Sequence, residues 1–172
     1  TGVSVDNATG DIYASGRHQG LTAGTVVISA PSTIDAFVVK YDSLGNAIWG
    51  KSWGGIGTDI AHRVDVQDSS NIVVVGSLGA TSAATTVAFD AVATFTLAGV
   101  NSLEGYVAKM SSSDGSFIWA NMSTGTGNEE IQDVKTDSSG NVFVIGWFGS
   151  TTLTVGSSTL TKYGGNDVWL AK

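Results

Sequence analysis

The chain has 172 residues, of which 13% are charged, and its formal net charge is −7. This acidic balance argues against binding to nucleic acid or to an anionic membrane surface, since both attract basic proteins. Cysteine is absent, which excludes disulfides and thiolate metal sites. No apolar run reaches the ~18 residues that a transmembrane helix needs, so we expect no membrane insertion.

The composition favours β-structure. Glycine is abundant, at 23 residues, and proline occurs once. Runs of valine and isoleucine, bounded by glycine, serine and asparagine, predict short strands and tight turns. No window shows the period of 3.6 residues and the caps that are typical of a helix.

In chain order, the sequence divides into units of four short strands, which we letter A to D. The first unit has strand A at 3–6, strand B at 12–15 ending at Gly16, strand C at 36–41 and strand D at 47–53. The second has the same strands at 61–66, 72–76, 106–110 and 117–122. The third has strands A, B and C at 131–136, 142–147 and 168–171. Between strands B and C, each unit carries an insert that we interpret as a small hairpin, at 17–34, 77–103 and 151–161.

The units repeat with a common spacing. Three pairs of residues are each separated by 70 positions: Gly45 and Gly115, Trp49 and Trp119, Gly76 and Gly146. A lysine recurs near the end of strand C in each unit, at Lys40, Lys109 and Lys172. Spacing that is constant within strands and varies between them is typical of tandem units with variable loops.

Four short antiparallel strands in each unit of 60–70 residues predict a β-propeller. The units would be blade 1 at 1–59, blade 2 at 60–129 and a partial blade 3 at 130–172. Each blade has two apolar faces that are buried only when neighbouring blades stack on them. Because a propeller has four to eight blades, we expect strand C at 168–171 to pair with further residues.

Several motifs carry a resemblance to a known family. They are DAFVVKYDSLGNAIW at 35–49, GG-G-D at 54–59, D-SSGN-VFVIG at 137–146 and GG-NDVWLAK at 164–172. With these motifs the chain resembles the SBBP-type β-propeller repeats of bacterial secreted and cell-surface proteins. The resemblance covers nearly the whole chain. It implies an extracellular or cell-surface location and a role as a scaffold or adhesion module. Its implied partners are further repeats of the same chain or neighbouring chains.

The tryptophans have two interpretations. Trp49 and Trp119 recur at one position of the repeat, which favours packing between blades over stacking on a sugar ring. Trp147 and Phe148 begin an insert and are the candidates for exposed aromatic residues that bind carbohydrate.

The acidic residues also recur once per unit. Asp35, Glu104 and Asp167 precede strand C, and we expect them to cap turns or to pair with the lysines that end it. Asp59 and Glu129 occupy one position of the crossing between units. Calcium at the turns 6–11 and 137–141 is the alternative, but neither turn has a complete calcium-binding loop. We therefore expect no metal and no cofactor.

Three further features complete the sequence-based predictions. His18 and His62 lack partners for a catalytic triad or a zinc site, so we expect both at the surface. The sequons at Asn7 and Asn121 are possible glycosylation sites. We predict a non-enzymatic scaffold or interaction module, with a carbohydrate-binding module and a filament subunit as alternatives.

Overall fold

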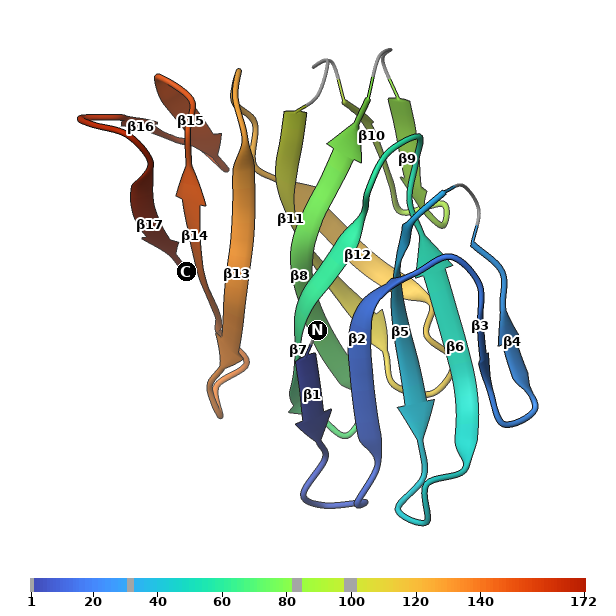
Figure 1. Cartoon of the computed structure of the whole chain (residues 1–172). Coiled ribbons are helices and arrows are strands. Elements are labelled where there is room, and N and C mark those ends of the chain that lie inside the picture. The colour runs from blue at the N-terminus through green and yellow to red at the C-terminus, as the bar shows by residue number, and fades with distance from the viewer. Residues whose placement is uncertain (1, 31–32, 82–84, 98–101) are drawn as a thin grey trace.

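The computed structural model describes residues 2–30, 33–81, 85–97 and 102–172. All of its regular structure is β-strand, arranged as three successive antiparallel sheets and three two-stranded hairpins (Figure 1). No helix among the described residues is long and apolar enough to cross a membrane. The all-β fold predicted from the sequence is confirmed, and the sheets have the form of propeller blades.

The predicted strands A to D correspond to the strands of these sheets in the predicted order. The first sheet has the order β1 (Gly2–Val5), β2 (Ile12–His18), β5 (Asp35–Tyr41), β6 (Ala47–Trp53). The second contains β7 (Ile60–Asp68), β8 (Asn71–Ala80), β11 (Ser102–Ser111) and β12 (Phe117–Met122). The third contains β13 (Glu129–Thr136), β14 (Val142–Phe148) and β17 (Asp167–Ala171).

Each predicted insert forms a two-stranded hairpin. The hairpins are β3–β4 (Leu21–Ala23 and Val26–Ile28), β9–β10 (Thr85–Phe89 and Ala93–Leu97) and β15–β16 (Thr152–Val155 and Ser158–Thr161). Parts of the first two inserts, at 31–32, 82–84 and 98–101, lie outside the described residues. The hairpins are more than surface loops, because Ile28, Phe89 and Leu153 each point into a hydrophobic core.

One prediction about the strand ends is wrong. Gly16 and Gly76 do not end strand B, because β2 continues to His18 and β8 continues to Ala80. A Cβ atom at Gly76 would clash with the carbonyl oxygen of Ile60 on the neighbouring strand. That neighbour, β7, is bulged next to this point, where its pairing shifts between Ala61 and Arg63. Glycine here permits close approach of two backbones within a strand.

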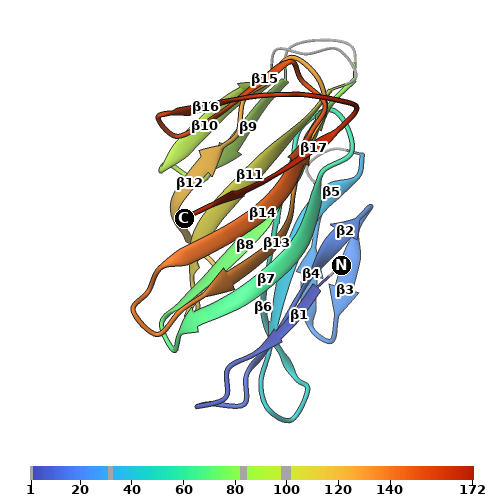
Figure 2. The same ribbon diagram turned by 90° about the vertical axis from the view of Figure 1, so that its left-hand side faces the viewer.

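The three sheets lie one behind another in Figure 2. Two hydrophobic cores fill the spaces between them. We call the space between the first and second sheets the first junction, and that between the second and third sheets the second junction. The first is rich in aromatic residues: the Trp53 ring lies 5.2 Å from Phe117 and 6.0 Å from Tyr106, between ring centroids. The second is mainly aliphatic and includes Val75 and Val144, with Trp169.

Candidate functional site

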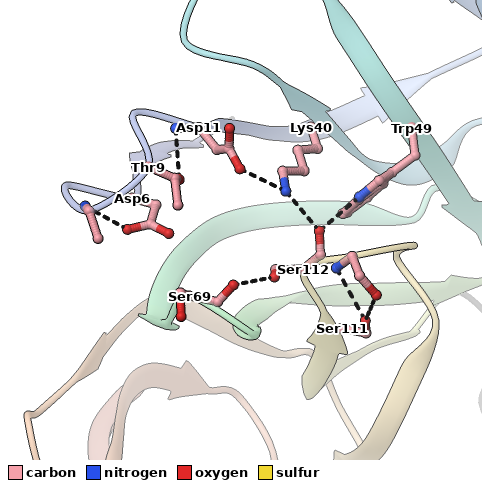
Figure 3. Close-up of polar contacts among 10 residues, drawn as sticks. Asp6, Thr9, Asp11, Lys40, Trp49, Ser69, Ser111 and Ser112 are labelled. Atoms are coloured by element: carbon pink, nitrogen blue, oxygen red, sulfur yellow. Dashed lines mark hydrogen bonds and ion pairs between the residues drawn. The ribbon is translucent and has the colours of Figure 1, made fainter.

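Trp49 is held at the first junction by a turn of the second sheet. Its side chain is only 9% exposed, and its Nε1 atom donates a hydrogen bond of 3.1 Å to the backbone oxygen of Ser112. The ammonium group of Lys40 donates to the same oxygen, also at 3.1 Å, and forms an ion pair of 2.8 Å with Asp11 (Figure 3). Burial opposes the charge, but the bonds with Asp11 and Tyr13 hold the pKa of Lys40 above its ordinary value.

The same turn covers the indole ring. Gly115, with φ of 73°, lies so close that a Cβ atom there would be 2.8 Å from Trp49. Gly45 has the same place in the first sheet, with φ of 86°, and its Cβ would meet no atom within 4 Å. Both glycines therefore have the left-handed conformation that glycine adopts readily in a tight turn, but only Gly115 also covers a tryptophan.

The second junction repeats these positions without the cover. Lys109 pairs with Trp119 across β11 and β12, as Lys40 pairs with Trp49 across β5 and β6. Trp119 is only partly buried, so it is less enclosed than Trp49 at the same position of the repeat. Within the described part of the chain, neither the Lys109 ammonium group nor the Trp119 indole N–H has a hydrogen-bond partner.

Trp119 instead lines a groove of about 510 Å³ between the second and third sheets. The apolar part of the lining includes Phe95, Met122 and Val144. The polar part comprises Asn121, Thr124, Thr154 and Lys172. The groove therefore offers one aromatic ring, an apolar wall and several hydrogen-bonding groups.

A pair of buried carboxyl groups lies at the first junction. Asp35 and Asp59 both approach Gly54 so closely that a Cβ atom there would clash with one oxygen of each. Asp59 accepts hydrogen bonds from the N–H groups of Gly55 at 2.8 Å and of Gly79 at 2.9 Å. Burial, reinforced by the charge of Asp35, raises the pKa of Asp59 to about 7.

The second junction has an equivalent pair, Glu104 and Glu129. Glu129 accepts a hydrogen bond of 3.2 Å from the N–H of Ser150 and another from its hydroxyl group. Burial and the neighbouring charge of Glu129 raise the pKa of Glu104 to about 8. That these acids form pairs was not predicted from the sequence. Glu104 and Glu129, for example, are 25 positions apart in the sequence and come together only in the folded chain.

The ion pair of Lys40 is with Asp11, which was not among the acids predicted to pair with it. The predicted turn-capping role is confirmed for Asp167, which accepts a hydrogen bond of 2.7 Å from the N–H of Tyr163. Asp59 and Glu129 also satisfy backbone N–H groups, at the crossings between sheets. The recurrence of acids once per unit is thus explained by backbone capping and carboxyl pairing.

The candidate carbohydrate-binding residues occupy different environments. Trp147 is half-buried on β14, while Phe148 is only 2% exposed and packs in the second core. Phe148 therefore presents no surface to a ligand in this structure, because strand alternation turns it toward the second sheet. The sequon residues Asn7 and Asn121 are both exposed, Asn7 in the turn after β1 and Asn121 on β12.

The prediction that both histidines lie at the surface is wrong. His18 is 9% exposed and its Nε2 atom lies 2.8 Å from the Ser52 hydroxyl. Burial lowers the pKa of His18, with Asp35 acting in the opposite direction. His62 lies 3.0 Å from the carboxylate of Glu130, from the next sheet. Each histidine therefore connects two strands of the fold. The sequence could not indicate these contacts, because neither histidine recurs at a matching position of the repeat.

The turns considered for calcium satisfy their oxygens locally. Asp137 accepts hydrogen bonds of 2.9 Å from the N–H groups of Ser139 and Asn141, and Asp6 accepts one of 2.8 Å from Ala8. Such bonds are typical of Asx-turns. In the ranges that the structure describes, no three histidine, aspartate or glutamate side chains are grouped to hold a metal ion.

Comparison with known proteins supports the propeller architecture. No family model matches the chain. The chain is 26% identical over 141 residues to a protein of Acanthamoeba polyphaga mimivirus described as an uncharacterized WD repeat-containing protein, L264. The match covers 81% of this chain and 10% of that protein. The chain is thus an all-β protein with sheets of propeller-blade type and a distant WD-repeat relative.

Proposed function

We propose that the chain is a non-enzymatic β-propeller segment that acts as a scaffold and binds further repeat units, from the same chain or from neighbouring chains. The supporting observation is a difference in burial at equivalent repeat positions. Val64 and Val134, on the first strands of the second and third sheets, are 3% and 2% exposed. Val3, at the same position of the first sheet, is 69% exposed.

The third sheet shows the same difference on its opposite face. Val75, on β8, is fully buried against the third sheet, while Ile145, 70 positions later on β14, is 40% exposed. Val168 and Leu170, on the neighbouring β17, are 72% and 70% exposed. Contiguous apolar surface of this kind marks an interaction site. The outward face of the first sheet therefore corresponds to the faces that pack against a preceding sheet. The outward face of the third sheet corresponds to the faces that pack against a following sheet.

Self-association tests the proposal, since a second copy presents both kinds of outward face. We expect sedimentation velocity to show concentration-dependent association, and Ile145→Lys together with Leu170→Lys to abolish it. Leu44→Lys is the control, because Leu44 is 86% exposed in the turn between β5 and β6 and lies on neither outward face. A wild-type protein that remains monomeric up to its solubility limit would contradict the proposal.

The location outside the cell or at its surface belongs to this proposal. It rests on the resemblance to SBBP-type repeats of bacterial secreted and cell-surface proteins. The exposed sequons at Asn7 and Asn121 would be accessible to glycosylation if the chain passes through a secretory pathway that carries it out. Fractionation of the source cells with an antibody to the chain tests this placement.

The groove favours carbohydrate binding as a second candidate function. Trp119 offers a partly exposed ring, and Asn121, Thr124 and Thr154 supply hydrogen-bonding groups beside it. An aromatic platform with adjacent polar groups is suited to a sugar ring, whose faces are apolar and whose edges carry hydroxyls. A glycan array would show binding that Trp119→Ala removes and that Trp147→Ala, on the outward face of the third sheet, retains. If neither variant alters binding, the groove is not the saccharide site.

A filament subunit is the third candidate. Among the residues that the structure describes, β17 pairs with β14 alone, and a free strand edge can template pairing between chains. Electron microscopy of concentrated protein would show ordered polymers.

A further inference from the structure

We propose that Glu104 and Glu129 share one proton, that this proton joins the second and third sheets, and that its loss at mildly alkaline pH loosens the junction. Glu104 lies on β11 of the second sheet and Glu129 on β13 of the third. They are 6% and 0% exposed. The pair therefore connects two sheets in a place that water barely reaches.

The hydrogen bonds leave one oxygen of each group unsatisfied. Glu129 Oε1 accepts from Ser150, and Glu104 accepts from the N–H of Gly125. Among the described residues, the Oε2 atoms of both side chains are buried and have no hydrogen-bond donor, and the charge of Glu129 acts on Glu104. Ionised carboxylates only accept hydrogen bonds, whereas a protonated carboxyl group supplies an O–H donor. One proton between the two groups satisfies both oxygens.

Two ionised carboxylates would be costly here, because like charges in a buried site repel each other and both lose solvation. In the described chain, no lysine, arginine or histidine forms an ion pair with either group. Two basic side chains near this part of the chain contact other groups: Lys162 donates a hydrogen bond to the carbonyl of Gly149, and His62 lies beside Glu130. The proton is thus the partner that the site itself favours.

The first junction also has a carboxyl pair at the equivalent positions, where Asp35 and Asp59 meet at Gly54. Two titratable groups interact with that pair. The charge of Asp35 acts to raise the pKa of His18, and the charge of Asp59 acts to raise the pKa of Tyr106. Repetition at two junctions indicates that the carboxyl pair is a part of the repeat. Each pair lies where the chain crosses between sheets, so its protonation acts on how firmly neighbouring sheets are held.

The direction of the pH effect follows from linkage. A carboxyl group that holds its proton more tightly in the folded protein than in the unfolded chain stabilises the fold at low pH. That contribution is lost as the pH rises to the folded-state value. Acidic surroundings therefore hold the sheets together, and pH values near 8 loosen the second junction.

Chemical unfolding of wild type and Glu104→Gln between pH 5 and pH 8 tests the proposal. The amide of the variant is a permanent N–H donor to Glu129 and replaces the proton. We expect the wild-type equilibrium constant for unfolding to rise at least about tenfold over this range. The fold-increase in the variant should be about ten times smaller than in the wild type. Asp133→Asn is the control, because Asp133 is exposed and lies outside the pair, and its profile should match the wild type.

Two further measurements keep the test decisive. If Glu104→Gln does not fold, carboxyl-carbon NMR of the wild type should show Glu104 titrating well above an ordinary glutamate, and an ordinary titration overturns the proposal. Calcium ions alone, added at pH 8, should leave the unfolding midpoint unchanged. A rise in the midpoint that disappears in Glu104→Gln would mean that the pair holds a cation, and would also overturn the shared proton. Equal pH profiles of wild type and Glu104→Gln would do the same.

Discussion

The two junctions are built from the same repeat positions but are filled differently. At the first, a turn of the second sheet covers Trp49, and the β9–β10 hairpin adds Phe89 to an aromatic cluster around Trp53. At the second, Trp119 lines a groove, and the β15–β16 hairpin contributes Leu153 to an aliphatic core. The comparison shows that the repeat sets the backbone positions, while neighbouring turns and inserts decide whether a residue becomes core or surface.

The largest expected effect separates the two tryptophans. Trp49→Ala should lower the free energy of unfolding by about 3–5 kcal/mol, the range for emptying a buried aromatic site. Trp119→Ala should cost about 1–2 kcal/mol, because the ring is already partly in water and less contact is lost. Denaturant unfolding of both variants gives the comparison. Equal losses would show that the groove at Trp119 closes in solution.

The sequence predicted the frame of the fold because strand periodicity and turn chemistry are local. The spacing of Gly45, Trp49 and Lys40 located strands C and D, and the valine runs located strands A and B. The different burial of Trp49 and Trp119 could not be predicted, since it depends on which turn lies above each ring. Nor could the carboxyl pairs, because Asp35 and Asp59 meet only after the chain has crossed between sheets.

The next effect concerns the two crossings. Asp59 uses both carboxyl oxygens to accept backbone N–H bonds, whereas Glu129 uses only Oε1 toward Ser150. Asp59→Asn must place its amide N–H₂ against one N–H donor, which should cost about 1–3 kcal/mol, the range for a buried unsatisfied group. Glu129→Gln can keep its oxygen toward Ser150 and turn its amide toward Glu104. Thermal unfolding near pH 5 should show the larger loss in Asp59→Asn, and the reverse order would contradict this assignment of oxygens.

The junctions should also differ in the pH at which they respond. Burial raises the pKa of Asp59 from 3.8 to about 7 and that of Glu104 from 4.5 to about 8. Since both folded-state values lie above the ordinary ones, stability is lost as the pH rises and levels off above each value. Between pH 7 and pH 8 the loss should be about 1 kcal/mol, below the limit of ~1.4 kcal/mol for one group and one pH unit. Glu104→Gln should remove this loss of stability between pH 7 and pH 8, and Asp35→Asn should retain it. Urea unfolding at the two pH values measures the difference.

The smallest effect compares the two turn glycines. Alanine at either Gly45 or Gly115 must adopt a positive φ, which costs about 1 kcal/mol. At Gly115 the added methyl group would also lie 2.8 Å from the Trp49 ring, whereas at Gly45 it would meet no atom within 4 Å. Gly115→Ala should therefore lower the free energy of unfolding more than Gly45→Ala does, by about several tenths of a kcal/mol or more, because the ring or the turn must shift to make room. In the Trp49→Ala background this excess should disappear, because the clashing ring is gone, while the cost of the positive φ remains. A double-mutant cycle measures the excess directly. An excess that persists without Trp49 would mean that Gly115 is required by the turn alone, and that the turn does not serve as the cover of the tryptophan.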